Sequence, residues 1–194
     1  EIAGALISIV LVLVAVFLLV GELNLSKVVE YQAAAHSFLG WLVFKQPVAF
    51  VIFLVAMFAE TNRTPFDLPE AEQELAGGYN VEYSSMKFAL FFMGEYANLT
   101  AAAALMTTLF LGGWSLPFAG LDHPAATFSV GLLHIGIFLA KTVSVIFMVI
   151  WVRWMWPRFR YDQLMDLGWR RFIPLALANI VVTAAVLWAK RGNL

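Results

Sequence analysis

The sequence predicts an all-α polytopic membrane protein, and two observations carry that prediction. Of the 194 residues, 62% are apolar and only 13% are charged, whereas a soluble domain has roughly 45–50% apolar and about 25% charged residues. The apolar residues also gather in runs of about 20, the length of a membrane-spanning helix, while the strands of membrane barrels are shorter and alternate in polarity. We expect one membrane domain over residues 1–194.

Five apolar segments are predicted to cross the membrane, and they cover residues 2–21, 39–59, 88–112, 128–152 and 172–189. The second contains Pro47, which we expect to kink its first turns. The chain begins at Glu1 without a methionine and enters the first segment almost at once. We interpret it as part of a longer protein and not as the start of a secretory precursor.

The one long polar segment, residues 60–87, lies between the second and third predicted spans. It reads ETNRTPFDLPEAEQELAGGYNVEYSSMK and holds six carboxylates against Arg63 and Lys87. A connection this long and acidic suggests a functional site more than a simple linker.

Within this segment, Asp67 predicts the start of a short helix on which Glu70 and Glu74 share one face. Clustered carboxylates raise one another's pKa values, so these groups are candidate proton carriers near neutral pH. A solvated acidic surface helix is the plainer alternative.

Five spans place successive connections on alternating sides of the membrane. The side of the acidic segment collects Arg63, Lys87, Arg153, Arg158, Arg160, Arg170 and Arg171, and the other side collects Lys27, Lys45, Lys190 and Arg191. Because basic residues concentrate on the cytoplasmic side, we expect the acidic segment to face the cytoplasm, or the matrix or stroma if the protein belongs to an organelle. The location we expect first is a bacterial inner (plasma) membrane.

Two charged residues lie inside predicted spans, where charges are costly and mark function by default. Counting 1.5 Å per residue from the basic end of each helix places Glu95 about 12 Å deep and Lys141 about 18 Å deep. The sequence therefore predicts that the two side chains meet, directly or through water. The pair either takes part in proton transfer or only fixes the packing of the helices.

Few other residues suggest chemistry. The chain has no cysteine, so it cannot hold an iron–sulfur cluster through thiolates. His36, His123 and His134 lack metal-ligand spacing, and we expect no metal site. We also expect no nucleic acid partner. Arg158, Arg160 and Tyr161 are predicted to contact lipid headgroups or a partner protein.

Two stretches resemble a known family. They are AETNRTPFDLPEAEQEL (59–75), which continues through GGYNVEYSSMKFALFFMGEYANL, and PRFRYDQLMDLGWRRFIPL (157–175). Both are similar to the H-type membrane subunit of NADH:quinone oxidoreductase (respiratory complex I), called subunit 1 in mitochondria. The resemblance covers essentially the whole chain. That family has about eight spans, and the five here look like its fourth to eighth, without the N-terminal helices.

The resemblance implies roles for particular residues. Those matching the family's quinone chamber and its loop are Glu60, Arg63, Phe66, Asp67, Glu70, Glu72 and Glu74. Those matching the family's proton path are Glu1, Glu82 and Glu95. To this path the sequence itself adds Lys141, as the predicted partner of Glu95.

The implied function is a membrane component of a proton-pumping translocase. The quinone, ubiquinone or menaquinone, would be the substrate, while NADH, FMN and iron–sulfur clusters would belong to partner subunits. The implied partners are the quinone-reducing subunits of the peripheral arm, other membrane-arm subunits and the lipid bilayer. This chain would be non-redox, and alone it would catalyse nothing.

Two alternatives stay open from the sequence. One is the membrane anchor of an energy-converting hydrogenase or formate hydrogenlyase, and the match across the acidic segment argues against it. The other is a stand-alone ion channel or transporter, and the lack of an internal repeat with paired broken helices argues against that.

Overall fold

The computed structural model describes residues 2–61, 63, 65–66, 85–117, 127–157 and 159–192. Every regular element in these ranges is a helix, which confirms the predicted all-α class. The elements are α1 (Ile2–Val20), α2 (Leu25–Ala33), the 3₁₀ turn η1 (Phe38–Gly40), α3 (Leu42–Lys45), α4 (Pro47–Glu60), α6 (Met86–Phe110), α7 (Phe128–Met155), α8 (Tyr161–Met165), the π-helical segment η3 (Asp166–Phe172) and α9 (Ile173–Gly192).

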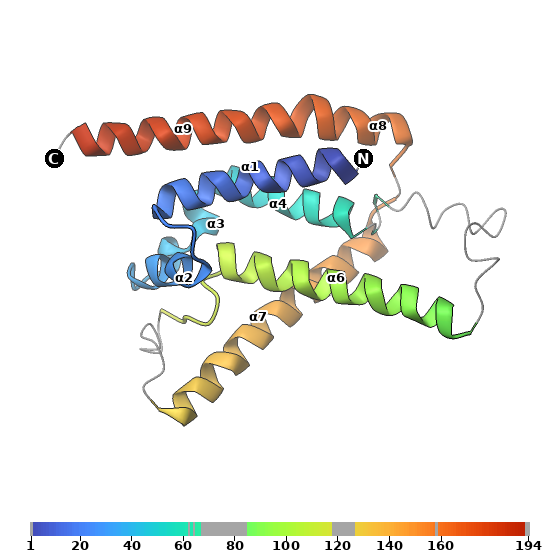
Figure 1. Ribbon diagram of the computed structural model, residues 1–194, viewed down its shortest axis with the longest axis horizontal. Coiled ribbons are helices and arrows are strands. Elements are labelled where there is room, and N and C mark those ends of the chain that lie inside the picture. Colours follow the sequence, from blue (N-terminus) through green and yellow to red (C-terminus); the bar gives the residue numbers. More distant parts are fainter. Residues whose placement is uncertain are drawn as a thin grey trace.

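The helices form two groups. In the first, α1 packs along both α4 and α9, and in the second α6 packs along α7. Figure 1 shows α9, α1 and α4 lying roughly side by side, while α7 crosses α6 obliquely. The two groups meet where Phe110 of α6 packs against Phe50 and Phe53 of α4, with ring centroids 5.5 and 5.6 Å apart. This contact lies in the apolar core of the described part of the chain.

Each of the five predicted spans holds an apolar helix, although the second is broken. Three described helices are long and apolar enough to cross a membrane by themselves: α6, α7 and the continuous stretch from Asp162 to Lys190. A fourth qualifies if α1 is taken together with α2, from which it is bent by 56°. The remaining apolar helix, α4, has 14 residues, or about 21 Å of length.

Pro47 is the physical reason for the break in the second span. It occupies the first turn of α4, and Gln46 before it leaves the helical region with φ −133° and ψ 65°. Proline fits a helix start because its missing N–H would have no partner there. The predicted kink is thus confirmed, as a separate short helix α3 ahead of α4.

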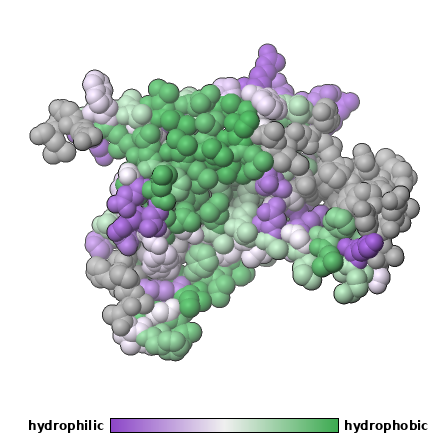
Figure 2. All heavy atoms as spheres, viewed as in Figure 1, coloured by the Kyte–Doolittle hydropathy of each residue, from purple (hydrophilic) through white to green (hydrophobic). Residues whose placement is uncertain are grey.

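Large apolar side chains cover much of the outer surface. Leu132, Phe147, Val181 and Trp188 are all more than half exposed, and Figure 2 shows apolar residues spread widely over α9 and α1. Exposed apolar area on this scale is typical of a surface that contacts lipid or another protein.

Successive helices alternate in direction, as the topology prediction requires. In Figure 1 the start of α1, the end of α4, the start of α6 and the end of α7 all lie at the same end of the molecule. The acidic segment and the connection after α7 therefore leave the bundle at that end, called here the acidic end.

At the opposite end, the C-terminus of α6 is buried and held by Gln32 of α2. This side chain is 1% exposed, and its Nε2 donates to the carbonyls of Thr108 and Leu109, at 3.2 and 3.1 Å. Its Oε1 accepts from the backbone N–H groups of Leu42 and Gly112, at 3.2 and 3.1 Å. One glutamine thus ties α2, α3 and α6 together and satisfies carbonyls that a helix end leaves without partners.

Gly112 and Gly113 allow the chain to turn directly after α6. Both have positive φ, 72° and 52°. A Cβ on Gly112 would come within 2.7 Å of Trp41 Nε1, and one on Gly113 within 2.8 Å of Val29 Cγ2. Side chains are therefore excluded at both positions, by conformation and by space.

A second buried glutamine holds the other helix group. Nε2 of Gln46 donates to Oγ1 of Thr183 in α9 at 3.2 Å and lies 3.5 Å from the carbonyl of Ala15 in α1. The side chain of Gln46, which lies at the break between α3 and α4, thus joins α1, α4 and α9.

We predict that Gln32→Leu lowers the free energy of unfolding of the full-length protein by about 2–4 kcal/mol, because it leaves several buried backbone groups without partners. Thermal unfolding in detergent, followed by circular dichroism, measures the change. Gln163→Leu is the matched control, because Gln163 is exposed and its contact in the described structure is a 3.4 Å one with the backbone nitrogen of Arg160. Equal effects of the two substitutions would contradict the role given to Gln32.

Candidate functional site

The acidic segment begins by folding back against the end of α4. Oγ1 of Thr61 donates to the carbonyl of Met57 at 2.9 Å, and the backbone N–H of Arg63 donates to the carbonyl of Phe58 at 3.2 Å. Phe66, three residues later, is 6% exposed. The first residues of the segment are therefore part of the packed bundle.

The two stretches that carry the family resemblance meet at this point. The backbone N–H of Phe159 donates to the carbonyl of Pro65 at 3.0 Å. The rings of Phe66 and Phe159 lie 5.6 Å apart at 58°, a favourable tilted contact. Residues nearly 100 positions apart thus form one structural unit, which the sequence did not predict.

Arg63 places a positive charge from the acidic segment in the interior of the bundle. Its side chain is 7% exposed, and Nη2 lies 3.9 Å from a carboxylate oxygen of Glu95 in α6. The guanidinium also stacks over the ring of Tyr96, 4.7 Å from its centroid, a cation–π contact. Nε and Nη2 are buried without a hydrogen-bond partner in the described structure.

Lys141 does not meet Glu95, so the predicted pair is wrong. Its Nζ donates to the carbonyls of Leu111, Gly113 and Ser115, at 2.8, 3.0 and 2.7 Å. An ammonium group has three donors, and all three are used. The ammonium also lies 4.6 Å from the centre of the Trp41 ring. Lys141 therefore stabilises the carbonyl-rich end of α6, as a cation at a helix C-terminus does.

The error came from taking Lys87 and Arg153 as markers of the same depth. Lys141 lies 12 residues before Arg153, or about 18 Å, whereas Leu111 lies 24 residues after Lys87, or about 36 Å. Because Lys141 contacts the carbonyl of Leu111, α7 must be shifted along α6, and the two basic residues are not level. Glu95 lies 16 residues before Leu111, or about 24 Å along the helix.

Glu60 ends α4 at the acidic end. One of its carboxylate oxygens, Oε2, is buried and accepts no hydrogen bond in the described structure. Of the residues predicted for the chamber and the proton path, Glu60, Arg63, Phe66 and Glu95 are thus placed at this end, with a direct contact between Arg63 and Glu95.

Most of the remaining predicted site residues lie outside the described part of the chain. They are Glu1, Asp67, Glu70, Glu72, Glu74, Glu82 and Arg158, and the helix predicted to start at Asp67 lies outside it too. Arg160 is exposed just before α8, and the side chain of Tyr161 is not described. Within the described ranges, no three His, Asp or Glu side chains gather as metal ligands.

A cleft of about 500 Å³ lies between α6 and α7 at the acidic end. Its lining consists of Arg63, Tyr96, Leu99, Val149, Ile150, Arg153 and Trp154. The volume falls in the range of small-molecule and headgroup sites. The charged residues among those that line it are both arginines.

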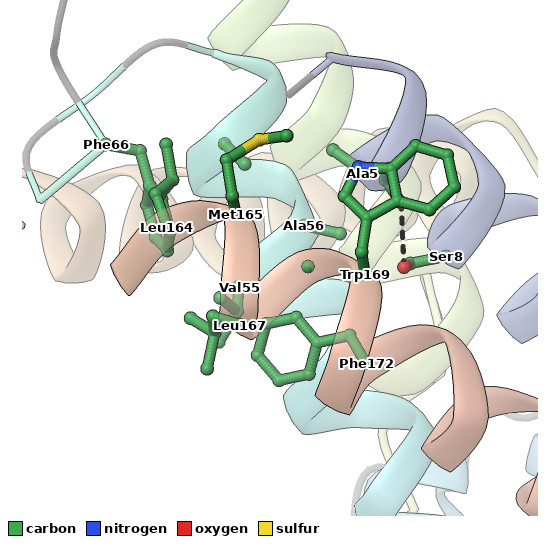
Figure 3. Close-up of a pocket in the computed structure, with 13 residues that line it drawn as sticks. Ala5, Ser8, Val55, Ala56, Phe66, Leu164, Met165, Leu167, Trp169 and Phe172 are labelled. Carbon is green, nitrogen blue, oxygen red and sulfur yellow. Dashed lines mark hydrogen bonds between the residues drawn. The ribbon is translucent and has the colours of Figure 1, made fainter. Parts of the chain in front are cut away.

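A second pocket lies between α1, α4 and η3 and is shown in Figure 3. Trp169 and Phe172 point into it from η3, Ala5 and Ser8 line it from α1, and Phe66 stands at its edge. The hydroxyl of Ser8 already donates to the carbonyl of Gly4 at 2.9 Å. With about 40 Å³ and mostly apolar walls, this space suits a methyl-sized apolar group and is far too small for a substrate ring.

Comparison with known proteins gives a consistent result. The family model described as NADH dehydrogenase matches residues 5–184. Among curated proteins, NADH-quinone oxidoreductase subunit 8 of Rhodothermus marinus is 52% identical over 174 residues, which are 87% of this chain and 51% of the relative.

Two further relatives are H subunits of NADH-quinone oxidoreductases. The protein of Paramagnetospirillum magneticum is 49% identical over 183 residues, 94% of this chain and 50% of the relative. An H subunit of Geobacter metallireducens, numbered 2, is 49% identical over 176 residues, 91% of this chain and 46% of the relative. The chain spans about half the length of the curated relatives it matches.

We predict that Lys141→Met lowers the free energy of unfolding by about 2–4 kcal/mol, because three partly buried carbonyls lose a charged donor. Lys190→Met, at an exposed position in the last turn of α9, should change it by less than about 0.5 kcal/mol. Thermal unfolding of the full-length protein in detergent measures both.

A double substitution tests whether Lys141 and Glu95 interact. Groups about 24 Å apart act independently, so the effects of Lys141→Met and Glu95→Gln should add to within about 0.5 kcal/mol. If Glu95→Gln instead restored the stability lost in Lys141→Met, the two side chains would be paired after all.

Proposed function

The chain belongs to the NADH dehydrogenase family, and from that premise we propose that it acts as the H-type membrane subunit of a proton-pumping NADH:quinone oxidoreductase. In this proposal the quinone is reduced in a chamber shared with subunits of the peripheral arm. The chain contributes walls, charge and protons, while NADH, FMN and iron–sulfur clusters belong to the partner subunits.

The single observation that carries the proposal is the placement of Arg63. Arg63 belongs to the acidic segment, and its buried side chain contacts Glu95 in α6. The segment proposed to face the chamber and a carboxylate inside a membrane helix are thus in direct electrostatic contact. A contact of this kind offers a direct electrostatic route by which a charge change in the segment could reach the membrane helix.

We propose the following sequence of events. Reduction of the quinone changes the charge beside the segment that holds Arg63 and Asp67. The neighbouring carboxylates, Glu70, Glu72 and Glu74, respond with coupled changes in proton affinity. Glu82, Glu95 and Glu1 continue this path into the membrane arm, and Glu60 and Phe66 form part of the chamber wall.

Lys141 has a different place in this scheme. Its donors are all taken by carbonyls at the far end of α6, so we assign it to positioning α6 and not to proton transfer with Glu95. We further propose that the acidic segment faces the cytoplasm in a bacterial inner membrane. Arg158, Arg160 and Tyr161 then contact partner subunits or lipid on that side.

We predict that Asp67→Asn in the assembled enzyme lowers quinone reductase activity by about tenfold or more, because it removes a charge that the coupling path uses. NADH oxidation by an artificial, water-soluble electron acceptor should stay within about twofold of the wild-type rate, since that reaction bypasses the quinone. The two rates are measured on the same membrane preparation. Glu30→Gln, which replaces an exposed carboxylate paired with Lys27 in α2, should change neither.

Two outcomes would contradict the proposal. Equal quinone reductase activity in Asp67→Asn and wild type would remove Asp67 from the path. Loss of both activities would indicate that the substitution prevents assembly, and the role in coupling would then have no support from this position.

A further inference from the structure

The cleft between α6 and α7 has a buried floor with unmet hydrogen-bonding capacity. Arg63, Leu99 and Val149 are 6%, 3% and 2% exposed. Nε and Nη2 of Arg63 donate to no acceptor in the described structure, and the carboxylate of Glu95, at 3.9 Å from Nη2, is beyond hydrogen-bond distance. Buried guanidinium N–H groups left without acceptors are unfavourable. A ligand that brings a hydrogen-bond acceptor to the floor of the cleft would therefore be stabilised there.

The rim of the cleft faces outward. Tyr96, Ile150 and Trp154 are 51%, 43% and 84% exposed, and Arg153 stands beside Trp154 near the end of α7. The cleft therefore opens on the outer surface of the α6–α7 pair, among residues of the kinds that sit at the membrane interface. Below it, exposed apolar side chains such as Phe147 continue along α7.

We propose that this cleft binds the phosphate group of an anionic phospholipid. Among the described residues that line it, two arginines are the only charged ones, and a guanidinium donates paired hydrogen bonds that match phosphate geometry. Basic pockets between membrane helices bind anionic headgroups in this way. The volume of about 500 Å³ accommodates a glycerophosphate headgroup, and the acyl chains lie along the apolar surface of α7.

The charge and position of the cleft favour this occupant over two others. A quinone ring is neutral, so its oxygens accept weaker hydrogen bonds from a guanidinium group than phosphate oxygens do. Free phosphate has the right charge but gains nothing from the exposed apolar residues beside the rim. The inference goes beyond the proposed function and does not rest on it, because lipid retention is measurable without turnover.

The test uses the detergent-purified enzyme containing the full-length protein, incubated with phosphatidylglycerol or phosphatidylcholine. Native mass spectrometry of the released chain then counts retained lipid. We expect at least about tenfold more phosphatidylglycerol than phosphatidylcholine on the wild type, and a fall of about tenfold in Arg153→Gln, because a charged hydrogen-bond donor is lost. Arg153→Lys keeps the charge and should retain most of the binding.

Arg170→Gln is the matched control, because Arg170 also belongs to the acidic end but is 85% exposed and pairs with Asp166. It should retain phosphatidylglycerol as the wild type does. Equal retention of the two lipids, equal losses in Arg153→Gln and Arg170→Gln, or no loss in Arg153→Gln would each overturn the proposal. Displacement of the lipid by an equal concentration of inorganic phosphate or of a short-chain quinone would also overturn it and would identify the other ligand.

Discussion

The buried C-terminal end of α6 is the constraint on which the arrangement of the other helices depends. The last carbonyls of a helix have no partners within it, and inside a membrane water cannot supply them. Here Gln32 and Lys141 satisfy the carbonyls of Thr108, Leu109 and Leu111 and two in the turn that follows. Because these side chains come from α2 and α7, one polar cluster fixes three helices relative to one another.

Fixing one end of α6 also sets the position of the other. Glu95 and Tyr96 face the acidic end, where Arg63 lies against both. The segment that holds Arg63 is in turn attached to the connection after α7 by Pro65, Phe66 and Phe159. The proposed chamber segment is therefore joined to the bundle through packing as well as charge, and a change at Arg63 has a structural route into α6.

The sequence predicted the fold better than it predicted the contacts between side chains. Apolar run lengths located all five helices and Pro47 located the break, because both effects are local in the chain. The pairing of Lys141 was mispredicted because the position of α7 along α6 is set by helix packing, which run lengths do not encode. Gln32 was missed because it lies in a segment that reads as a polar connection. Its spacing after Val28 and Val29 on the buried face of α2 was the available signal.

The contact between Arg63 and Glu95 is the central claim, and a double-mutant cycle in the assembled enzyme tests it most directly. Quinone reductase activity would be measured for Arg63→Gln, Glu95→Gln and the double variant, each normalised to NADH oxidation by an artificial acceptor. If the two groups transmit charge to each other, their effects are non-additive, with a coupling of about 0.5–3 kcal/mol. Strictly additive losses would contradict the account.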